Sequence, residues 1–558
     1  MDFVRSSWGG DIINYLSGGR FLQFPEQQPG FDFAQHCAAT RRTSVPIVSN
    51  DDDTVASGVV GSGADLEKDE KILENEPVAD AEDAPADVIV VDWYGPDDPE
   101  NPRNWNSSKR YFTLALVGFL TAAVYIGSSI YTPGVTELMA EFHFGTTVAA
   151  LPLSVYVMAY GISPMLYGPM SEFPAIGRNW TIMPSLFVFV ILQIPTALSK
   201  NLASLLVLRA ITGFVSAPPL TVGGACIGDV MDPRYLAYGI ASWACAASIG
   251  PIMGPFIGAA VTIAEDWRWT FWLLCWLSGL CFLVMLFLFP ETSADTILYR
   301  RAARLRKLYG CDKYRTRAEI ASADQTMKEF CYNSFVRPFI IAFREPSVFC
   351  FNCYTGLIYA VMYIFFEAFP IVFQEVHHFT LIENGLAYFG IFVGLFIIGP
   401  VYCAILHYYT IPRLMNGAPP ELVLRVCLIG APLLPVSLFV FGWTSSPDIH
   451  WIFPIIGSGI FFIGAFLIFQ TIFAYLGMSY PRYIASVFGG NAFFRAMFAA
   501  SFPLFARDMF VNLNSYNGKF PVALGSTILG CLGIFMIMIP IVLLWMGDRV
   551  RAQSRFAN

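Results

Sequence analysis

The stretch "ASIGPIMGPFIGAA", residues 247–260, is uncharged and apolar, yet it contains two Gly-Pro pairs. A proline removes a backbone donor and crowds the carbonyl four residues earlier, which breaks most soluble helices. In a membrane helix the bend is tolerated, because neighbouring helices satisfy the freed backbone groups. Small residues four positions apart also let two membrane helices approach closely. We therefore predict a bent membrane helix with a close-contact face at Ala246, Gly250, Gly254 and Gly258, flanked by Pro251 and Pro255. Ordinary Gly and Pro enrichment in membrane helices is the alternative.

The composition places this helix among many others. Of the 558 residues, 55% are hydrophobic, 16% are aromatic and only 14% are charged. The apolar residues form blocks of about twenty, which is the length that crosses a hydrocarbon core. We predict twelve spans, near 112–132, 147–168, 180–199, 203–224, 236–262, 269–289, 347–371, 384–406, 422–443, 451–476, 483–504 and 520–546. The chain is thus expected to be an all-α membrane protein, and soluble enzyme classes are excluded.

The spacing of six spans, a polar stretch and six spans predicts two halves with a substrate site between them. The predicted parts are an acidic N-terminal tail (1–108), a first half (109–290), a basic central loop (291–346), a second half (347–546) and a C-terminal tail (547–558). The tail is expected to be largely disordered, because its acidic 51–100 stretch is poor in aromatic residues. A helix on the membrane surface is the alternative for 3–24.

Lys and Arg residues predict the orientation. They are concentrated in the central loop, for example at Arg300, Arg301 and Arg304, and alternation of the spans leaves few of them on the opposite side. Short loops rich in Lys and Arg remain cytoplasmic, so both termini are expected in the cytosol. The close pair Cys350 and Cys353 has no His or second Cys pair beside it to complete a zinc site. We expect no metal, no cofactor and no nucleic-acid partner.

Charges inside apolar spans are candidates for function, because their insertion into lipid is costly. Arg209, Glu367 and Arg495 are such charges. Tyr359 and Tyr363 precede Glu367 at intervals of four, so the three share one helix face. Aromatic walls with one titratable carboxylate suit a hydrophobic substrate and a proton site. Glu367 in a structural pair with an arginine is the alternative. The further candidates for the substrate cavity are Phe466, Gln470, Phe473 and Asn491. Simple core or lipid-facing contacts remain the alternative for the aromatic residues.

Several motifs resemble those of the major facilitator superfamily. "GPIMGP" is similar to its antiporter motif, and "LLVLRAITGF" is similar to its fourth-span motif, which carries an intramembrane arginine at Arg209 here. "GPMSEFPAIGR" resembles the loop motif that follows the second span, although it has Glu for Asp and a longer spacing. The residues that match this loop motif are Gly168, Glu172, Gly177 and Arg178. The resemblance implies that they form a cytoplasmic gate with Asp229, and a plain charged loop is the alternative.

Within the superfamily, "DDPENPRNW", "WRWTFW" and "GAFLIFQTIF" resemble the twelve-span fungal drug:proton antiporters, including the yeast fluconazole and benomyl resistance exporters. This resemblance implies the major facilitator fold and the export of azole-type antifungals, benomyl-like fungicides or other xenobiotics in exchange for protons. It also implies a plasma-membrane location, with the vacuolar membrane as an alternative, and a monomer. It further implies that the fifth and eighth spans meet, so the stripe through Gly254 is expected to face Gly390, Gly394 and Gly399.

Other functions are weighed against this one. A dedicated exporter of a self-made fungal secondary metabolite would carry the same motifs. A nutrient uptake carrier should lack the antiporter stripe. A multi-span enzyme would need clustered His or acidic residues at a membrane face, and the six His residues are scattered. We therefore expect a transporter of hydrophobic small molecules, embedded in the lipid bilayer, and not an enzyme.

Overall fold

The computed structural model describes residues 2–17, 21–27, 88–323, 326–513 and 519–557. These ranges are almost entirely helical. Their one strand pairing is a parallel contact of two residues between β1 (Ile89–Val90) and β2 (Tyr314–Arg315). The part of the predicted disordered tail at 28–87 lies outside the described residues.

Helices form wherever the sequence has long apolar blocks, and prolines divide several of them. Pro164, Pro218 and Pro503 each open a new helix, as a residue without an N–H can at a first turn. The helices of the first half are α4 (Ser107–Ser129), α5 (Val135–Phe142), α6 (Thr146–Ala149), α7 (Leu151–Ile162), α8 (Pro164–Glu172), α9 (Gly177–Ala197), α10 (Leu202–Val215), α11 (Pro218–Val230), α12 (Pro233–Ala264) and α13 (Trp267–Leu288).

The second half repeats this pattern. Its helices are α18 (Pro346–Phe369), η6 (Pro370–Val376), α19 (Leu381–Ala387), α20 (Phe389–Ile405), η7 (Leu406–Thr410), α21 (Ile411–Met415), α22 (Leu424–Gly430), α23 (Leu433–Trp443), α24 (Ile452–Ser479), α25 (Ile484–Ser501), α26 (Pro503–Asn512) and α27 (Ala523–Gln553). The central loop carries α14 (Ala294–Tyr309), α15 (Arg317–Ser322), α16 (Met327–Cys331), η5 (Tyr332–Val336) and α17 (Arg337–Arg344).

Eleven helical segments in the described ranges are long and apolar enough to cross a membrane, and each corresponds to a predicted span. The remaining predicted span, 483–504, is helical over α25 and α26 but is not among the eleven. It contacts α18 of its own half and α7 of the other half. The prediction of a multi-span helical protein is therefore confirmed.

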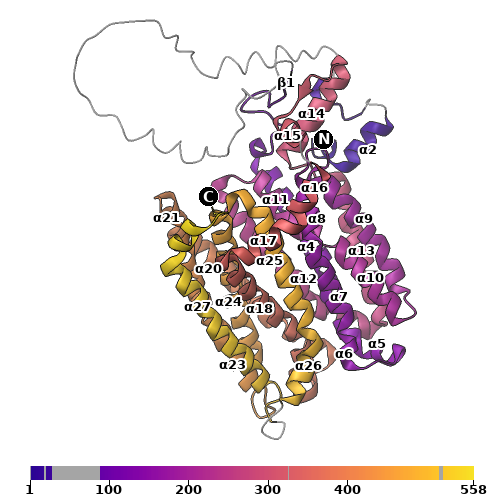
Figure 1. Cartoon of the computed structure of the whole chain (residues 1–558). Helices are drawn as coiled ribbons and strands as arrows, with labels where there is room; N and C mark the ends of the chain where they lie inside the picture. Colours follow the sequence, from indigo (N-terminus) through magenta and orange to yellow (C-terminus); the bar gives the residue numbers. More distant parts are fainter. Residues whose placement is uncertain (1, 18–20, 28–87, 324–325, 514–518, 558) are drawn as a thin grey trace, which may run out of the picture.

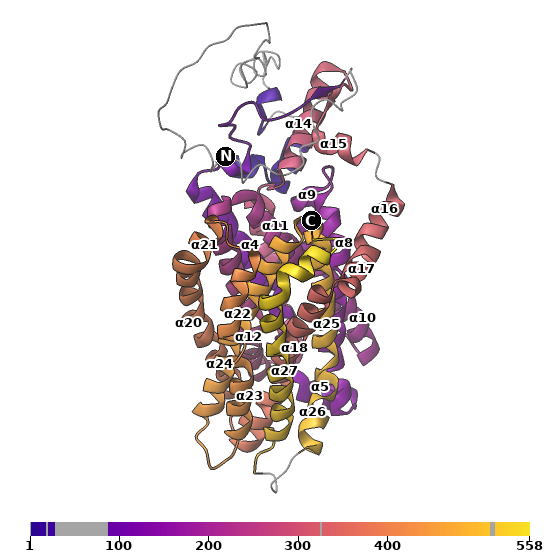
Figure 2. The same cartoon turned by 60° about the vertical axis from the view of Figure 1, so that its left-hand side comes forward.

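The two halves lie side by side, and both termini lie at the same end of the bundle (Figures 1 and 2). We call this the basic end, because Arg300, Arg301, Arg413 and Arg551 belong to the segments found there. Contacts between the halves run from α12 to α19 and α20, and from α7 to α25. These five helices therefore border the interface at which a substrate site is expected.

The glycine stripe of α12 packs against α4 and not against α20. A Cβ atom added at Gly250 would lie 2.7 Å from the Cβ of Tyr125, and one added at Gly254 would overlap Ser129 Oγ. Gly394 of α20 instead faces α24, where an added Cβ would lie 2.6 Å from the Gly459 carbonyl. The expectation that the two stripes face each other is wrong. A small-residue stripe predicts a close neighbour, but it does not identify which helix that neighbour is.

The same contact explains how the two prolines of α12 are tolerated. Pro255 has no N–H, so it cannot donate to the carbonyl of Pro251 four residues earlier. Ser129 of α4 donates its hydroxyl to that carbonyl at 3.0 Å. The backbone group freed by the second proline is thus satisfied by a neighbouring helix. Gly254 leaves the space in which Ser129 does this.

The N-terminal tail is structured in two places, so the prediction of disorder is wrong for them. Helix α2 (Trp8–Leu16) packs on α9 and α13, with the rings of Trp8 and Trp180 5.5 Å apart. It lies within the range predicted as an alternative surface helix. Residues 88–104 pack on α14, where Val91 is fully buried beside Leu305. Both segments find apolar partners in the central loop and first half, which the tail's own composition does not reveal.

Ion pairs connect the N-terminal tail to α14. Glu26, Asp98 and Glu100 of the tail pair with Arg301 and Arg304 of α14, and we call these ion pairs the latch. Arg301 donates to Asp98 at 2.7 Å, and Arg304 donates to Glu26 at 3.0 Å. Burial by itself would raise the pKa of Asp98 and of Glu26, but the adjacent guanidinium groups hold both values below their ordinary range. The latch is therefore charged at neutral pH.

Candidate functional site

Arg209 is buried in the first half, and backbone carbonyls surround its charge. It donates to the carbonyls of Gly127 (2.8 Å), Ser128 (3.3 Å) and Pro152 (3.3 Å). The first two belong to the last turn of α4, where carbonyls lack helical partners and the helix dipole favours a cation. The Tyr156 ring lies 4.3 Å from the guanidinium carbon and adds a cation–π contact. Arg209 has no ion pair among the described residues, so it caps α4 and holds α10 against it.

A tyrosine contact joins the halves near the middle of the bundle. The Tyr160 hydroxyl of α7 donates to the Tyr359 hydroxyl of α18 at 2.6 Å. The guanidinium of Arg495 lies 5.0 Å from the Tyr359 ring centre and 5.5 Å from that of Phe473. Tyr363 follows one turn later on α18, with its ring 5.2 Å from that of Tyr359. The structure thus brings together four of the predicted site residues and adds Tyr160, which the sequence did not single out.

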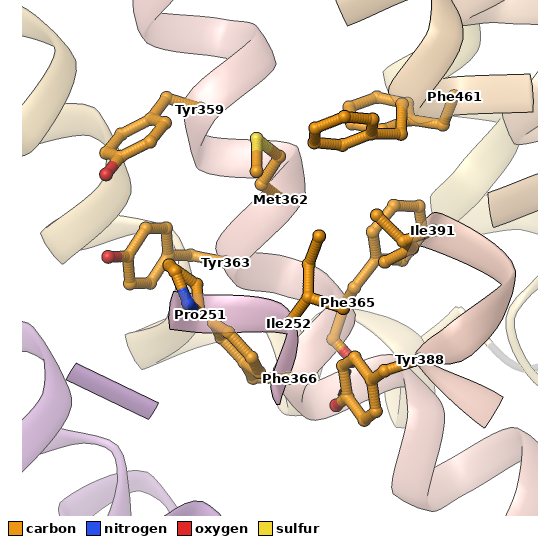
Figure 3. A pocket seen from close by; sticks show the side chains of 11 residues that line it. Pro251, Ile252, Tyr359, Met362, Tyr363, Phe365, Phe366, Tyr388, Ile391 and Phe461 are labelled. Atoms are coloured by element: carbon orange, nitrogen blue, oxygen red, sulfur yellow. Dashed lines mark hydrogen bonds between the residues drawn. The ribbon is translucent and has the colours of Figure 1, made fainter. Parts of the chain in front are cut away.

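A central cavity of about 30 Å³ lies beside this contact (Figure 3). Tyr359 and Tyr363 line it from α18, Pro251 and Ile252 line it from α12, and Phe461 lines it from α24. Figure 3 shows the two tyrosines one above the other, with both hydroxyls directed the same way. The space holds about one water molecule, whereas drug-sized ligands occupy roughly 300–1,000 Å³. The central cavity is therefore too small for a drug-sized ligand in this conformation.

Glu367 lies on α18 one turn beyond Tyr363 and is partly buried. It has no hydrogen bond or ion pair within the ranges that the structure describes. Arg507 is the cation that acts on it electrostatically, but Arg507 pairs with Glu375 at 2.6 Å. The structural ion pair considered for Glu367 is therefore not formed with any described residue.

The other predicted cavity residues lie outside this cavity. Asn491 is fully buried and donates to the side-chain oxygens of Asn352 and Thr355, both at 2.9 Å, which joins α25 to α18. Phe466 is buried against the Tyr402 ring, at 5.8 Å, and Gln470 is also buried. These positions stay predictions for a more open conformation, since none of them lines the cavity seen here.

The predicted gate residues gather at the basic end of the first half. Arg178 donates to Asp229 at 3.1 Å and to Ser171 at 2.7 Å, which ties α9 to α11 and α8. Gly177 has a φ of +74°, and an added Cβ would lie 2.8 Å from the carboxylate of Glu291, so glycine is required there. The spacing change in this motif therefore leaves the Arg178–Asp229 pair intact.

Glu291 is the residue of this cluster that sequence reasoning missed. Its buried carboxylate accepts the backbone N–H groups of Arg178 (3.0 Å) and Asn179 (3.2 Å), and so caps the N-terminus of α9. It also accepts the N–H groups of Thr292 and Ser293. The signal was its position in "PET" directly after the sixth span. In contrast, Glu172 is exposed and has no ion pair among the described residues, and nothing lies within 4 Å of a Cβ added at Gly168.

Comparison with known proteins agrees with this architecture. The sequence model of the Major Facilitator Superfamily matches residues 117–503 of this chain. The cycloheximide resistance protein of Candida maltosa is 41% identical, over 100% of this chain and 99% of its own. Fluconazole resistance protein 1 of Saccharomyces cerevisiae is 42% identical, over 85% of this chain and 86% of its own.

Solved structures share the fold at low identity. The human organic anion transporter MFSD10 has a TM-score of 0.51 at 16% identity, covering 79% of this chain and 100% of its own. The peptide transporter POT with alafosfalin has a TM-score of 0.54 at 14% identity, covering 82% of this chain and 98% of its own. Taken with the two-half helical bundle and its small central cavity, these matches show that the chain belongs to the Major Facilitator Superfamily.

Proposed function

We propose that this protein exports hydrophobic small molecules, including antifungal drugs, across the plasma membrane in exchange for protons. The observation that carries the proposal is the aromatic face of α18, which carries Tyr359, Tyr363 and Glu367 and closes onto the other half at Tyr160. Two relatives are named for resistance to cycloheximide and to fluconazole, and this chain aligns with most or all of their length. Their names support the same class of cargo. The working unit is a single chain.

In this proposal the basic end lies in the cytoplasm, because Lys and Arg are enriched there. Helices α25 and α26 form the eleventh of twelve spans. These two helices are less hydrophobic than the other spans, which fits a position between α7 and α18. In that position Arg495 contacts the aromatic ring of Tyr359. Rocking of the two halves then exposes the centre to one side of the membrane at a time.

Three groups of residues have distinct roles. Tyr359, Tyr363, Phe473 and Arg495 contact the cargo when the centre opens. Glu367 carries the proton, since a carboxylate can be charged when water reaches it and neutral when the site is closed. The Arg178–Asp229 pair and Glu291 keep the basic end of the first half rigid while the halves rock.

The experiment is drug export by this chain in a yeast strain that lacks its own pumps. We expect the chain to raise resistance to fluconazole, benomyl or cycloheximide, and vesicles from these cells to export the drug only when a proton gradient is imposed. Glu367→Gln should abolish gradient-driven export while the protein still reaches the membrane. Glu265→Gln is the matched control, because Glu265 is exposed and lies outside the proposed site.

Two results would contradict the proposal. Unchanged drug sensitivity with the protein present at the plasma membrane would reject drug export. Undiminished gradient-driven export by Glu367→Gln would remove Glu367 from the coupling, and would leave the exporter itself intact.

A further inference from the structure

Helix α2 carries an apolar face that the rest of the protein leaves exposed. Ile12, Tyr15 and Leu16 follow the i, i+3, i+4 spacing of one helix face. Their surfaces are 40%, 86% and 77% exposed. Single exposed apolar residues are common on protein surfaces, whereas a contiguous patch of them marks a surface that contacts a partner or a membrane. Three such residues on one face of this short helix form a contiguous patch.

The N-terminal part of the same face packs on two membrane spans. Trp8 precedes Ile12 by four positions and so shares its face, and its ring lies 5.5 Å from the Trp180 ring of α9. A Cβ added at Gly9 would lie 2.7 Å from the Leu286 carbonyl of α13, so glycine lets the backbone of α2 lie directly on that span. The apolar face therefore begins on the spans and continues past them.

The surface on which α2 packs is one that faces lipid. Trp180, Leu283 and Phe287 belong to α9 and α13, and 47%, 56% and 43% of their surfaces are exposed. Apolar side chains that a span exposes contact the acyl chains of a bilayer. All three lie near the basic end, where α9 begins at Gly177 and α13 ends at Leu288. Figure 1 shows α2 at the edge of the bundle, next to this end of α9.

Backbone contacts hold α2 in this place. The N–H of Glu291 donates to the carbonyl of Ser6 at 3.0 Å, and Ser7 and Pro290 form an isolated β-bridge. Ser7 also caps α2, because its hydroxyl accepts the N–H of Gly10 at 3.1 Å. The start of α2 is therefore fixed to the segment that follows α13, and this contact sets the direction of the apolar face.

The polar side of α2 contacts protein and not the bilayer. Asp11 lies about 100° around the helix from Ile12, and it pairs with Arg300 of α14 at 3.0 Å. Asn14 donates to the side chain of Gln27 at 3.5 Å. A helix with one polar and one apolar face lies in the plane of a membrane boundary, with its apolar face among the acyl chains. Insertion of this face therefore does not bury an unpaired charge.

We propose that α2 is an in-plane membrane anchor, in which Ile12, Tyr15 and Leu16 insert into the phospholipid leaflet at the basic end. Ile12 and Leu16 contact acyl chains, and Tyr15 suits the boundary with the head groups, where tyrosine is enriched in membrane proteins. The anchor is independent of the proposed export function. Through the pair of Asp11 and Arg300 it connects the lipid surface to α14.

The first test identifies what covers the apolar face. The photo-crosslinking residue p-benzoylphenylalanine replaces Tyr15 in the full-length protein in phosphatidylcholine nanodiscs, and peptide mass spectrometry identifies the products of illumination. We expect phosphatidylcholine adducts at this position. Replacement of Leu308 is the matched control, because Leu308 is an apolar residue of α14, in the central loop, and is 48% exposed. It should give no lipid adduct.

The second test measures whether insertion holds α2 in place. Hydrogen exchange of the α2 amides is compared in the same nanodiscs with and without the combined substitutions Ile12→Gln and Leu16→Gln. Glutamine has a helix propensity close to that of leucine and above that of isoleucine, so these substitutions do not weaken the helix itself. We expect exchange to become about tenfold faster, which corresponds to the loss of about 1.4 kcal/mol of binding. Leu308→Gln is the control and should leave the exchange of α2 unchanged.

The remaining outcomes overturn the proposal. Absence of lipid adducts at Tyr15, or equal adducts at Tyr15 and Leu308, excludes insertion. Adducts with peptides of this chain in place of lipid assign the apolar face to a protein surface. Unchanged exchange after the combined substitutions shows that the face does not anchor the helix. Neither measurement uses transport, so both decide the proposal whether or not the protein exports a drug.

Discussion

The contact between Gly254 of α12 and Ser129 of α4 makes a sharp prediction for the substitution Gly254→Ala. The new methyl group would stand 3.1 Å from both the Cβ of Ser129 and the backbone nitrogen of Ile130, and would overlap Ser129 Oγ. Ser129 must then move and release the Pro251 carbonyl. Overpacking costs about 1–3 kcal/mol, and an unsatisfied buried carbonyl costs about 1–3 kcal/mol more. Alanine regains about 1 kcal/mol of helix propensity, so we expect a net loss of about 1–5 kcal/mol.

The assay is thermal unfolding of the purified protein in detergent, together with drug export from vesicles. Gly254→Ala should lower the melting temperature by several degrees and reduce export at normal membrane targeting, and Gly254→Val should abolish export. Gly228→Ala is the control, because nothing lies within 4 Å of a Cβ at Gly228, so only the propensity gain remains. Ser129→Gly in the Gly254→Ala background should restore part of the stability, since it removes the overlapping atoms. A Gly254→Ala protein as stable and active as the unsubstituted one would refute the reasoning.

Four further predictions concern the charged groups. Arg209→Ala should abolish export and Arg209→Lys should retain part of it, because an ammonium replaces some of the donors that cap α4; normal export by Arg209→Ala would show that these contacts are dispensable. Glu291→Gln should lower the melting temperature, since one carboxylate oxygen that accepts an N–H is lost; the exposed Glu172→Gln is the control, and equal effects of the two would contradict the capping role. Arg301→Met should cost about 3–5 kcal/mol locally, because it leaves the buried Asp98 carboxylate without an ion-pair partner, and protease should then release the N-terminal segment. In the unsubstituted protein the lowered pKa of Asp98 keeps the latch closed at neutral pH, so its contribution should be lost only as the pH falls below about 4; release already at pH 6 would exclude this ion pair as the cause.

The sequence predicted most of the bundle, because span length and charge have simple physical limits. The predicted blocks of about twenty apolar residues are helical in the described ranges. Prolines open some of these helices, as Pro164 does, but lie inside others, as Pro251 and Pro255 do. The cluster of Tyr359, Tyr363 and Arg495 could also be predicted from the sequence. The two tyrosines are four residues apart on one helix face, and Arg495 is a charge inside an apolar span, which is costly.

What the sequence did not predict depends on contacts between distant segments. The glycine stripe of α12 indicates a close neighbour, but only the packed halves show that α4 supplies it. Glu291 looked like a loop residue, because capping of α9 requires two segments more than a hundred residues apart to meet. The structured tail was missed for the same reason, since composition averages over residues and hides the few, such as Glu26, that find a buried partner.

The latch also constrains the order of events during synthesis. Glu26 and Arg304 of the latch are 278 positions apart. Asp11 and Arg300, which form a further ion pair between α2 and α14, are 289 positions apart. At a translation rate of roughly 5–20 residues per second, the N-terminal segment waits about 14–58 s before its partners exist. During this interval the six spans of the first half enter the membrane. A nascent chain can therefore close the latch only after the whole first half has been inserted, which makes latch closure a checkpoint for the maturation of that half.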